Sequence, residues 1–233
     1  MVLHFSQPER PETHVVRFSS VLALILVGSL IAVVTRAQRA EQVLPVKNRD
    51  LQTELVRMRA EDQRYRNQMQ VEIMKMSSLG TTQQSEQLIA IVKKQDEIDK
   101  RNMARLEEII GQHGWPGRSL VGEEAANAGF LVLQHADLTV QKKYFPLVKE
   151  GASKGEVSPA DAAMLEDRIL TGEGKKQIYG SAVQLGPQTG GKLALHPIED
   201  EEHVDERRAA VGLMPLVEYL REFGLEYKRP TKR

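Results

Sequence analysis

The segment 113–137, HGWPGRSLVGEEAANAGFLVLQHAD, constrains the fold more than any other part of the chain. A Gly-Trp-Pro-Gly turn precedes residues 120–136, which are apolar on nearly every side of a helix. A helix without a solvent face must be wrapped by other helices, so this one is expected at the centre of the fold. Its polar residues Asn127, Gln134 and His135 need partners there, because an unpaired buried polar group costs roughly 1–3 kcal/mol. The sequence therefore predicts a buried polar site.

The composition excludes several classes of site and partner. The chain of 233 residues holds 32 lysines and arginines against 32 aspartates and glutamates, so no nucleic-acid partner is expected. Only the tail, 226–233, concentrates basic residues, and we interpret it as a short solvated segment. Cysteine is absent, which excludes disulfides, cysteine nucleophiles and thiolate metal ligands.

An uncharged apolar run at residues 18–35 predicts a single membrane-spanning helix, with the lipid bilayer as its partner. At 1.5 Å per residue it spans about 27 Å, close to the thickness of the hydrocarbon core. A cleaved signal peptide is the alternative, but Glu9 and Glu12 in the leader 1–17 favour an uncleaved signal-anchor. Basic residues in the linker 36–50 favour a cytoplasmic domain, whereas an N-terminal signal-anchor ordinarily exports the domain on its C-terminal side. The sequence therefore allows the helical domain to lie on either side of the membrane.

Residues 51–225 predict one mainly α-helical domain, a bundle around the buried central helix with one β-hairpin. Apolar residues recur every three or four positions over 51–76 and again over 88–109. Two such helices predict an antiparallel hairpin; a free coiled-coil stalk is the alternative, although the heptads are irregular. Ser119 and Ser158 stand where helix caps are expected. The remaining predicted elements are a helix over 141–149 that Pro146 disturbs, a helix after Ser158, a β-hairpin from 177–184 and 192–196, and helices at 204–211 and 216–223.

Polar residues interrupt the apolar faces of both helices in the predicted hairpin. Asp62 lies four residues before Arg66, which is the spacing of an ordinary ion pair along a helix. Because Asp62 falls on the apolar face, it is equally well interpreted as a pocket carboxylate whose charge Arg66 sets. Asn102 interrupts the next helix in the same manner, and a buried amide bridging two helices explains it most simply.

Two further positions suggest chemistry. His135 is interpreted either as a general base or ligand contact, with Asp137 orienting a partner, or as a core histidine bonded to the backbone. Asp167 and Arg168 lie within one predicted helix, where a solvated ion pair is the simple explanation. The alternative is that the guanidinium of Arg168 binds an anion, because arginine presents a planar pair of donors to carboxylate or phosphate.

The sequence predicts neither a metal site nor a cofactor. The spacing of the histidines and acids between 196 and 205 matches no pattern of metal ligands on a single element, so we interpret that stretch as an acidic solvated loop. The chain carries no glycine-rich phosphate loop, no nucleophile elbow and no helix with paired zinc-binding histidines.

These segments together resemble a bacterial family of domains of unknown function, over about Leu51 to Phe223. The motifs that carry the resemblance are DQxxR from Asp62 to Arg66, HGWPGRSLVGE from His113, QHAD from Gln134, Asp167-Arg168, Gln177…Tyr179-Gly180, and PIED…VDERR from Pro197. The resemblance implies one mainly helical domain and no known activity. It groups Asp62, Gln63, Arg66, His135, Asp137, Arg168 and Tyr179 in one site. After Gly180 the chain has Ser181-Ala182 where the family pattern has Thr-Gln, which places an intact site in question.

These residues are consistent with three alternative functions. The first is a binding module whose polar pocket holds a small anionic ligand or peptide end. Its proposed ligand contacts are Gln63, Arg66, Asn102, Gln134, Arg168 and Tyr179. The second is a hydrolase in which His135 is the general base, oriented by Asp62 or Asp137. The third is a structural interaction protein, in which the polar residues form a satisfied core network.

Overall fold

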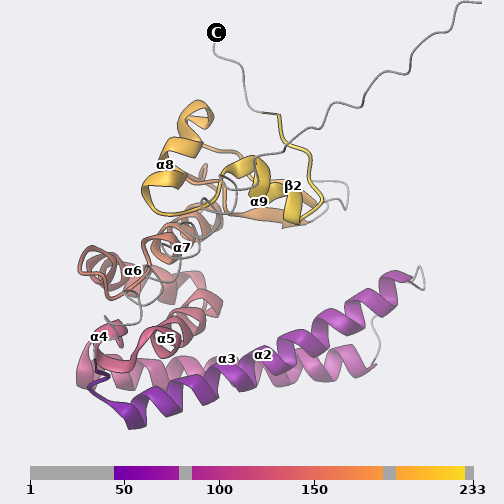
Figure 1. The fold of residues 1–233 in the computed structure, drawn as a ribbon. Coiled ribbons are helices and arrows are strands. Elements are labelled where there is room, and N and C mark those ends of the chain that lie inside the picture. Colours follow the sequence, from indigo (N-terminus) through magenta and orange to yellow (C-terminus); the bar gives the residue numbers. More distant parts are fainter. Residues whose placement is uncertain (1–44, 79–85, 186–192, 229–233) are drawn as a thin grey trace, which may run out of the picture. The chain divides into compact units, whose positions relative to one another are not determined.

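The computed structural model describes residues 45–78, 86–185 and 193–228 (Figure 1). All of these residues belong to one compact unit of the chain, 45–233. That unit is mainly α-helical and carries a two-stranded antiparallel β-hairpin. The predicted fold class is therefore confirmed for this part of the chain.

The predicted membrane helix at 18–35 lies outside the described residues, as do the leader 1–17 and most of the linker 36–50. Within the described ranges, no helix is both long and apolar enough to cross a membrane. Membrane attachment therefore stays a prediction from the sequence.

Helices α2 (Arg49–Ser78) and α3 (Glu86–His113) pack against each other as the predicted antiparallel hairpin. The residues that join them, 79–85, lie outside the described part of the chain. The ion pairs between the two helices run in opposite order along them: Glu54 with Arg105, Glu61 with Arg101, and Arg66 with Asp99. This register sets which polar side chains of α2 and α3 meet.

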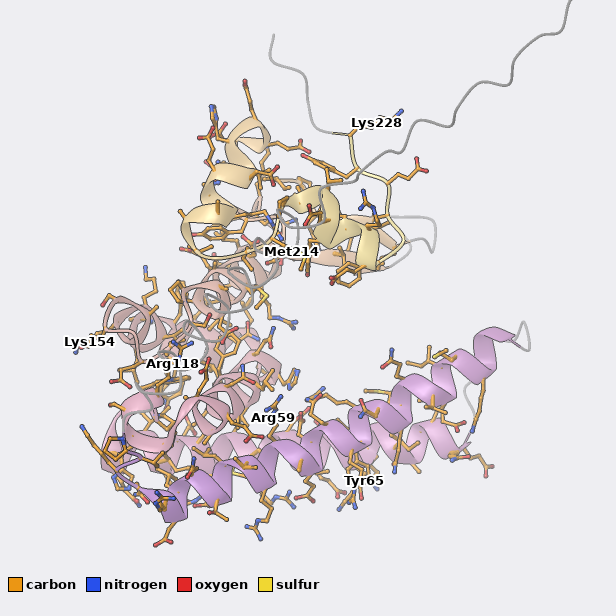
Figure 2. All side chains as sticks on the ribbon, viewed as in Figure 1. Arg59, Tyr65, Arg118, Lys154, Met214 and Lys228 are labelled. Atoms are coloured by element: carbon orange, nitrogen blue, oxygen red, sulfur yellow. The ribbon has the colours of Figure 1, made fainter. Side chains whose placement is uncertain are left out.

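Helix α5 (Glu123–His135) occupies the centre of the domain, as its apolar composition predicts. It packs against α2 and α3 on one side and against the next helix of the chain on another (Figure 1). Arg59 of α2 points toward α5 and pairs with Glu124 at 3.7 Å, whereas Tyr65 points away from it (Figure 2). The buried residues of α5 are Ala125, Ala126, Ala128, Gly129, Phe130, Val132 and Leu133.

The start of the central helix differs from the prediction. A short helix α4 (Arg118–Val121) precedes α5, and Gly122 separates the two with φ at 81°. An L side chain rarely adopts that conformation, so the glycine ends the short helix. Ser119 lies inside α4 rather than capping α5, and its main-chain N–H donates to Glu156 Oε2 at 2.8 Å. The prediction of one helix over 120–136 with a Ser119 cap is therefore wrong.

The Gly-Trp-Pro-Gly turn packs directly on the centre of α5. A Cβ added at Gly129 would lie 3.2 Å from Pro116 Cγ and 3.7 Å from Leu106 Cδ1 of α3. A larger side chain would have to displace the turn or α3. The glycine thus allows the close approach that buries α5.

Helices α6 (Leu138–Ser153) and α7 (Pro159–Gly172) pack against each other next to α5. Ser158 holds the predicted N-cap position of α7, although its side chain makes no capping hydrogen bond. Apolar residues of α2, α3, α5, α6 and α7 form the main core.

The C-terminal part adds a second, smaller core. Its elements are β1 (Val183–Leu185), β2 (Leu193–Leu195), the 3₁₀ turn η2 (Glu201–His203), α8 (Val204–Ala210) and α9 (Leu216–Glu222). The two strands are antiparallel, with Val183 opposite Leu195, and are shorter than predicted. The buried residues of this core are Ile198, Val204, Leu216 and Leu220.

Candidate functional site

Asp62 is the centre of a polar group buried between α2 and α3. The hairpin turns its side chain into the interface, where it is almost fully buried. Arg66, one turn further along α2, donates from Nε to both carboxylate oxygens at 3.0 and 3.1 Å. Gln63 donates from Nε2 to the same carboxylate at 2.8 Å. Asp62 is thus an ion-pair partner of Arg66 and a buried carboxylate.

Helix α3 supplies two residues that the sequence did not single out as site residues. Gln95 donates from Nε2 to Asp62 at 2.8 Å and to Asp99 at 2.9 Å. Arg66 reaches across and donates from Nη2 to Asp99 at 2.6 Å. Gln95, Asp99 and Asn102 succeed one another at spacings of four and three on an otherwise apolar helix face, and that pattern was the available signal.

His135, at the end of α5, completes this group. Its Nδ1 lies 3.8 Å from Asp62 Oδ2, which is too long for a hydrogen bond. That nitrogen is buried and makes no hydrogen bond within the described part of the chain. We call Asp62, Arg66, Gln95, Asp99 and His135 the carboxylate–histidine cluster.

The charges of the carboxylate–histidine cluster act on one another. Burial alone would raise the pKa of Asp62, but the hydrogen bond and charge of Arg66 outweigh it and hold that pKa below its usual value. Burial raises the pKa of Asp99, against the hydrogen bonds from Gln95 and Arg66. Burial and the positive charges of Arg66 and Arg168 lower the pKa of His135 to about 4, although Asp62 acts in the opposite direction. The imidazole is therefore neutral at pH 7.

Arg168, on α7, lies in a different setting. Its exposed side chain lines a pocket of about 360 Å³ together with Gln134, Ser181, His196 and Tyr219. It forms no ion pair with any residue that the structure describes, whereas Arg66 pairs with both Asp62 and Asp99. Surrounding protein and the charge of Arg66 lower the pKa of Arg168. Arg168 is thus a cation held close to another cation without a counter-ion among the described residues.

Asp167, which precedes Arg168 in the chain, is buried and hydrogen-bonded, whereas Arg168 is exposed. Asp167 is fully buried and accepts hydrogen bonds from the main-chain N–H groups of Ile178 at 2.7 Å, Tyr179 at 3.0 Å and Ser181 at 2.9 Å. The hydroxyl of Ser181 also donates to it, at 2.8 Å. We call this arrangement the Asp167 cradle. The solvated Asp167–Arg168 pair is therefore wrong, because one side chain points inward and the other outward.

Other motif residues support the same loop. Gln177 is buried and donates from Nε2 to the main-chain oxygens of Ala182 and His196. Arg208, also buried, donates to the main-chain oxygens of Tyr179 at 2.7 Å and Met214 at 2.6 Å. The motifs around Gln177 and Arg208 thus fix the backbone after α7, and the resemblance alone did not separate such structural residues from binding residues.

Besides Gln134 and Arg168, three more predicted site residues lie outside the carboxylate–histidine cluster. Tyr179 contributes its backbone to the Asp167 cradle, and its hydroxyl interacts with Glu166. Asp137 is exposed at the N-cap of α6. Asn102 is buried, its Nδ2 has no hydrogen-bond partner in the described chain, and it lines a separate pocket between α2 and α3.

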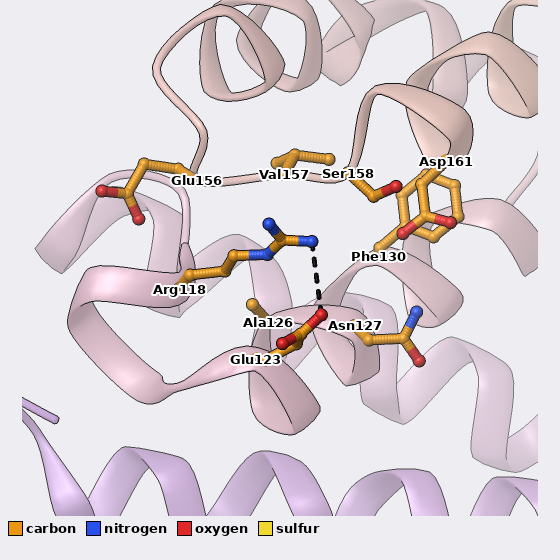
Figure 3. Close-up of a pocket in the computed structure, with 9 residues that line it drawn as sticks. All are labelled: Arg118, Glu123, Ala126, Asn127, Phe130, Glu156, Val157, Ser158 and Asp161. Carbon is orange, nitrogen blue, oxygen red and sulfur yellow. Dashed lines mark hydrogen bonds and ion pairs between the residues drawn. The ribbon is translucent and has the colours of Figure 1, made fainter. Parts of the chain in front are cut away.

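Asn127, one of the polar residues of the central helix, lines another pocket (Figure 3). That pocket has a volume of about 200 Å³ and lies where α4, α5 and α7 meet. Arg118 pairs there with Glu123 at 3.4 Å (Figure 3). Burial raises the pKa of Asp161, against a hydrogen bond from Asn127. Asn127 and Gln134 of α5 therefore line different pockets.

Comparisons with known proteins bear on the family alone. A family model, described as a family of unknown function (DUF6624), matches residues 49–229. No curated protein and no solved structure matches the chain. The match spans the whole helical domain, from the first turn of α2 to beyond α9, and confirms the predicted resemblance to a family without an assigned activity. The chain belongs to this family of unknown function.

Proposed function

We propose that the helical domain binds a small anionic ligand, such as a carboxylate or phosphate end, through Arg168. The observation that supports this most directly is that Arg168 lines a pocket without forming an ion pair among the described residues. A guanidinium in that position offers a planar pair of donors to an anion.

The lining of this pocket supports a small, partly polar ligand. Gln134 and His196 offer side-chain donors and acceptors, while Met164 and Phe223 contribute apolar walls. Tyr219 donates from its hydroxyl to the main-chain oxygen of Ser181 at 2.8 Å, which ties α9 to the loop behind the pocket. A few placed polar groups on an apolar lining are typical of small-molecule sites.

Binding is favoured over hydrolysis by the state of His135. A general base works best when its pKa lies near the working pH, and the pKa of His135 is lowered to about 4. Its Nδ1 also makes no hydrogen bond to Asp62 that would orient the ring. Asp137, the other carboxylate proposed for that role, is exposed at the start of α6.

Isothermal titration of the full-length chain with inorganic phosphate, and separately with acetate, tests the proposal. We expect one of these anions to bind, and Arg168→Ala to weaken binding at least about tenfold while Arg168→Lys retains part of it. Arg64→Ala is the matched control, because Arg64 is an exposed arginine of α2 that contacts Tyr65 and lines no part of this pocket. Equal binding by Arg168→Ala and the wild type, or no binding by the wild type, would contradict the proposal.

Membrane attachment through residues 18–35 is the second part of the proposed function, and the uncharged apolar sequence of that run supports it. We expect the full-length protein to stay in the membrane fraction after washing with alkaline carbonate. Release by high salt alone, or a mature N-terminus near Gln38, would contradict an uncleaved anchor. The side of the membrane on which the domain lies is a separate question that protease protection of intact cells answers.

A further inference from the structure

The carboxylate–histidine cluster is not fully satisfied by its own residues. Gln95 is only 4% exposed, and its Nε2 lies between the two carboxylates while its Oε1 has no hydrogen-bond partner in the described chain. His135 Nδ1 is likewise buried and without a hydrogen bond. Buried polar atoms are rarely left in this condition, so two such atoms in one cluster require an explanation.

Two ligand atoms of the cluster are spaced to bond one small cation, and a third lies close enough to reach it after a small side-chain movement. One ligand atom each from Asp62, Asp99 and His135 lies within 4.8 Å of the others, and His135 Nδ1 is 3.8 Å from Asp62 Oδ2. Bonds from a divalent metal to nitrogen and oxygen are about 2.0–2.2 Å long, so two of them on one ion span up to about 4.2 Å. One ion can therefore bond His135 and Asp62 at their present separation.

Gln95 offers a further ligand to the same ion. The oxygen and nitrogen of a side-chain amide are nearly interchangeable in shape. Without a cation, the amide presents Nε2 to the carboxylates of Asp62 and Asp99, because its oxygen would be repelled there. With a cation between the carboxylates, the reversed amide becomes favourable and brings Oε1 to the ion.

We propose that Asp62, Asp99, His135 and the amide oxygen of Gln95 bind one divalent transition-metal ion, such as Mn²⁺ or Zn²⁺. Oxygen ligands suit Mn²⁺, an imidazole suits Zn²⁺, and this mixed set accommodates either. The sequence predicted no metal site, because these ligands come from α2, α3 and α5 and form no local motif.

Arg66 is the residue that the metal must displace. Its guanidinium supplies the positive charge between Asp62 and Asp99, at 3.0 and 2.6 Å. Its side chain is 22% exposed, so it has access to solvent into which it can turn. Arg66 and the ion thus compete for the same two carboxylates. The proposal is independent of anion binding, because Arg168 contributes no ligand to the ion.

Titration of the full-length chain with Mn²⁺ alone tests the site, with the electron paramagnetic resonance signal of free Mn²⁺ as the measure. We expect one bound ion per chain and competition by Zn²⁺. His135→Ala and Asp99→Asn should each weaken binding at least about tenfold. Asp96→Asn is the matched control, since Asp96 is exposed on the same helix and its one ion pair among the described residues is with Lys100. Arg66→Gln should bind Mn²⁺ more tightly than the wild type, because the competing cation is gone.

A second measurement uses the wild-type protein. Its result therefore cannot be changed by a variant that fails to fold. Bound Mn²⁺ should broaden the ring signals of His135 in the proton spectrum more than those of His113, which is exposed at the end of α3. Absence of Mn²⁺ and Zn²⁺ binding up to millimolar concentration would overturn the proposal. So would binding that His135→Ala and Asp99→Asn leave unchanged, or broadening that spares His135. Since neither phosphate nor acetate is added, and Arg168 is not among the proposed metal ligands, these results are independent of the test of the anion pocket.

Discussion

Two buried carboxylates, Asp62 and Asp167, have very different surroundings. Asp167 is surrounded by donors from a single loop, and the Asp167 cradle is filled by main-chain N–H groups and one hydroxyl. Asp62 shares its donors Arg66 and Gln95 with a second carboxylate, and a buried imidazole nitrogen faces it without a hydrogen bond. Residue type and burial are the same in both regions, but the degree of hydrogen-bond satisfaction is not.

The difference separates a residue that holds the fold from one that is available to a ligand. A carboxylate saturated by main-chain donors fixes a backbone conformation and has no capacity left. A group of acidic and imidazole side chains whose acceptor atoms lack hydrogen bonds can still bind a cation. We therefore interpret the Asp167 cradle as structural and propose a binding role for the carboxylate–histidine cluster, and substitutions in both regions test this proposal.

The largest effect is expected from Asp167→Ala. It leaves the buried N–H groups of Ile178, Tyr179 and Ser181 without their acceptor, so the free energy of unfolding should fall by at least about 3 kcal/mol. Chemical denaturation followed by circular dichroism measures this, with Asp96→Asn as a control that should change little. A loss below about 1 kcal/mol would mean that water replaces the carboxylate and that the cradle is not structural.

A smaller loss is expected from Asp62→Asn. The amide keeps the size of the carboxylate and one acceptor oxygen but loses its charge for Arg66, so the free energy of unfolding should fall by about 1–2 kcal/mol. The same denaturation experiment decides the order of the two losses. If Asp62→Asn costs more than Asp167→Ala, Asp62 is the structural residue and the comparison is reversed.

A pH effect is expected from Glu166, next to the Asp167 cradle. Burial raises the pKa of Glu166, and the charge of Asp167 acts in the same direction, against Lys149 and a hydrogen bond from Tyr179. Folding therefore favours the protonated form. The resulting stability is present below the unfolded-state pKa and is lost as the pH rises through the folded-state pKa.

Glu166→Gln should remove this dependence on pH. Unfolding free energies of wild type and variant should be similar near pH 4, whereas the variant should be the more stable of the two at pH 7, by less than the losses above. Denaturation curves at the two pH values measure the difference. A variant that is less stable at pH 7 would show that ionised Glu166 makes a net favourable interaction.

The smallest effect on stability is expected from Arg168→Ala. The side chain is exposed and forms no ion pair among the described residues, so the free energy of unfolding should change by less than about 0.5 kcal/mol. Thermal unfolding without added anion measures this. A loss above about 1 kcal/mol would place Arg168 with the structural residues and remove the main support for an anion pocket.

The sequence was sufficient for the features that depend on local pattern. Helical periodicity located α2 and α3, and the apolar surface of α5 predicted its burial. The predicted helices at 204–211 and 216–223 correspond to α8 and α9. The spacing of Asp62 and Arg66 predicted their contact, because residues four apart on a helix are neighbours whatever the fold. The error at the start of the central helix also has a local cause. Gly122, which has a positive φ, divides the segment 120–136 that the apolar pattern predicted as one helix.

Only the tertiary structure decided which polar residues meet. Gln95 and Asp99 join Asp62 and Arg66 across a separation of 33 residues, and the register of the hairpin brings them together. Adjacent residues Asp167 and Arg168 take opposite roles because the loop after α7 folds back over one of them. Periodicity states which face of a helix is buried, but it carries no information about the partner on the other side. That partner depends on the packing of distant segments, and so do satisfied hydrogen bonds and capacity for a ligand.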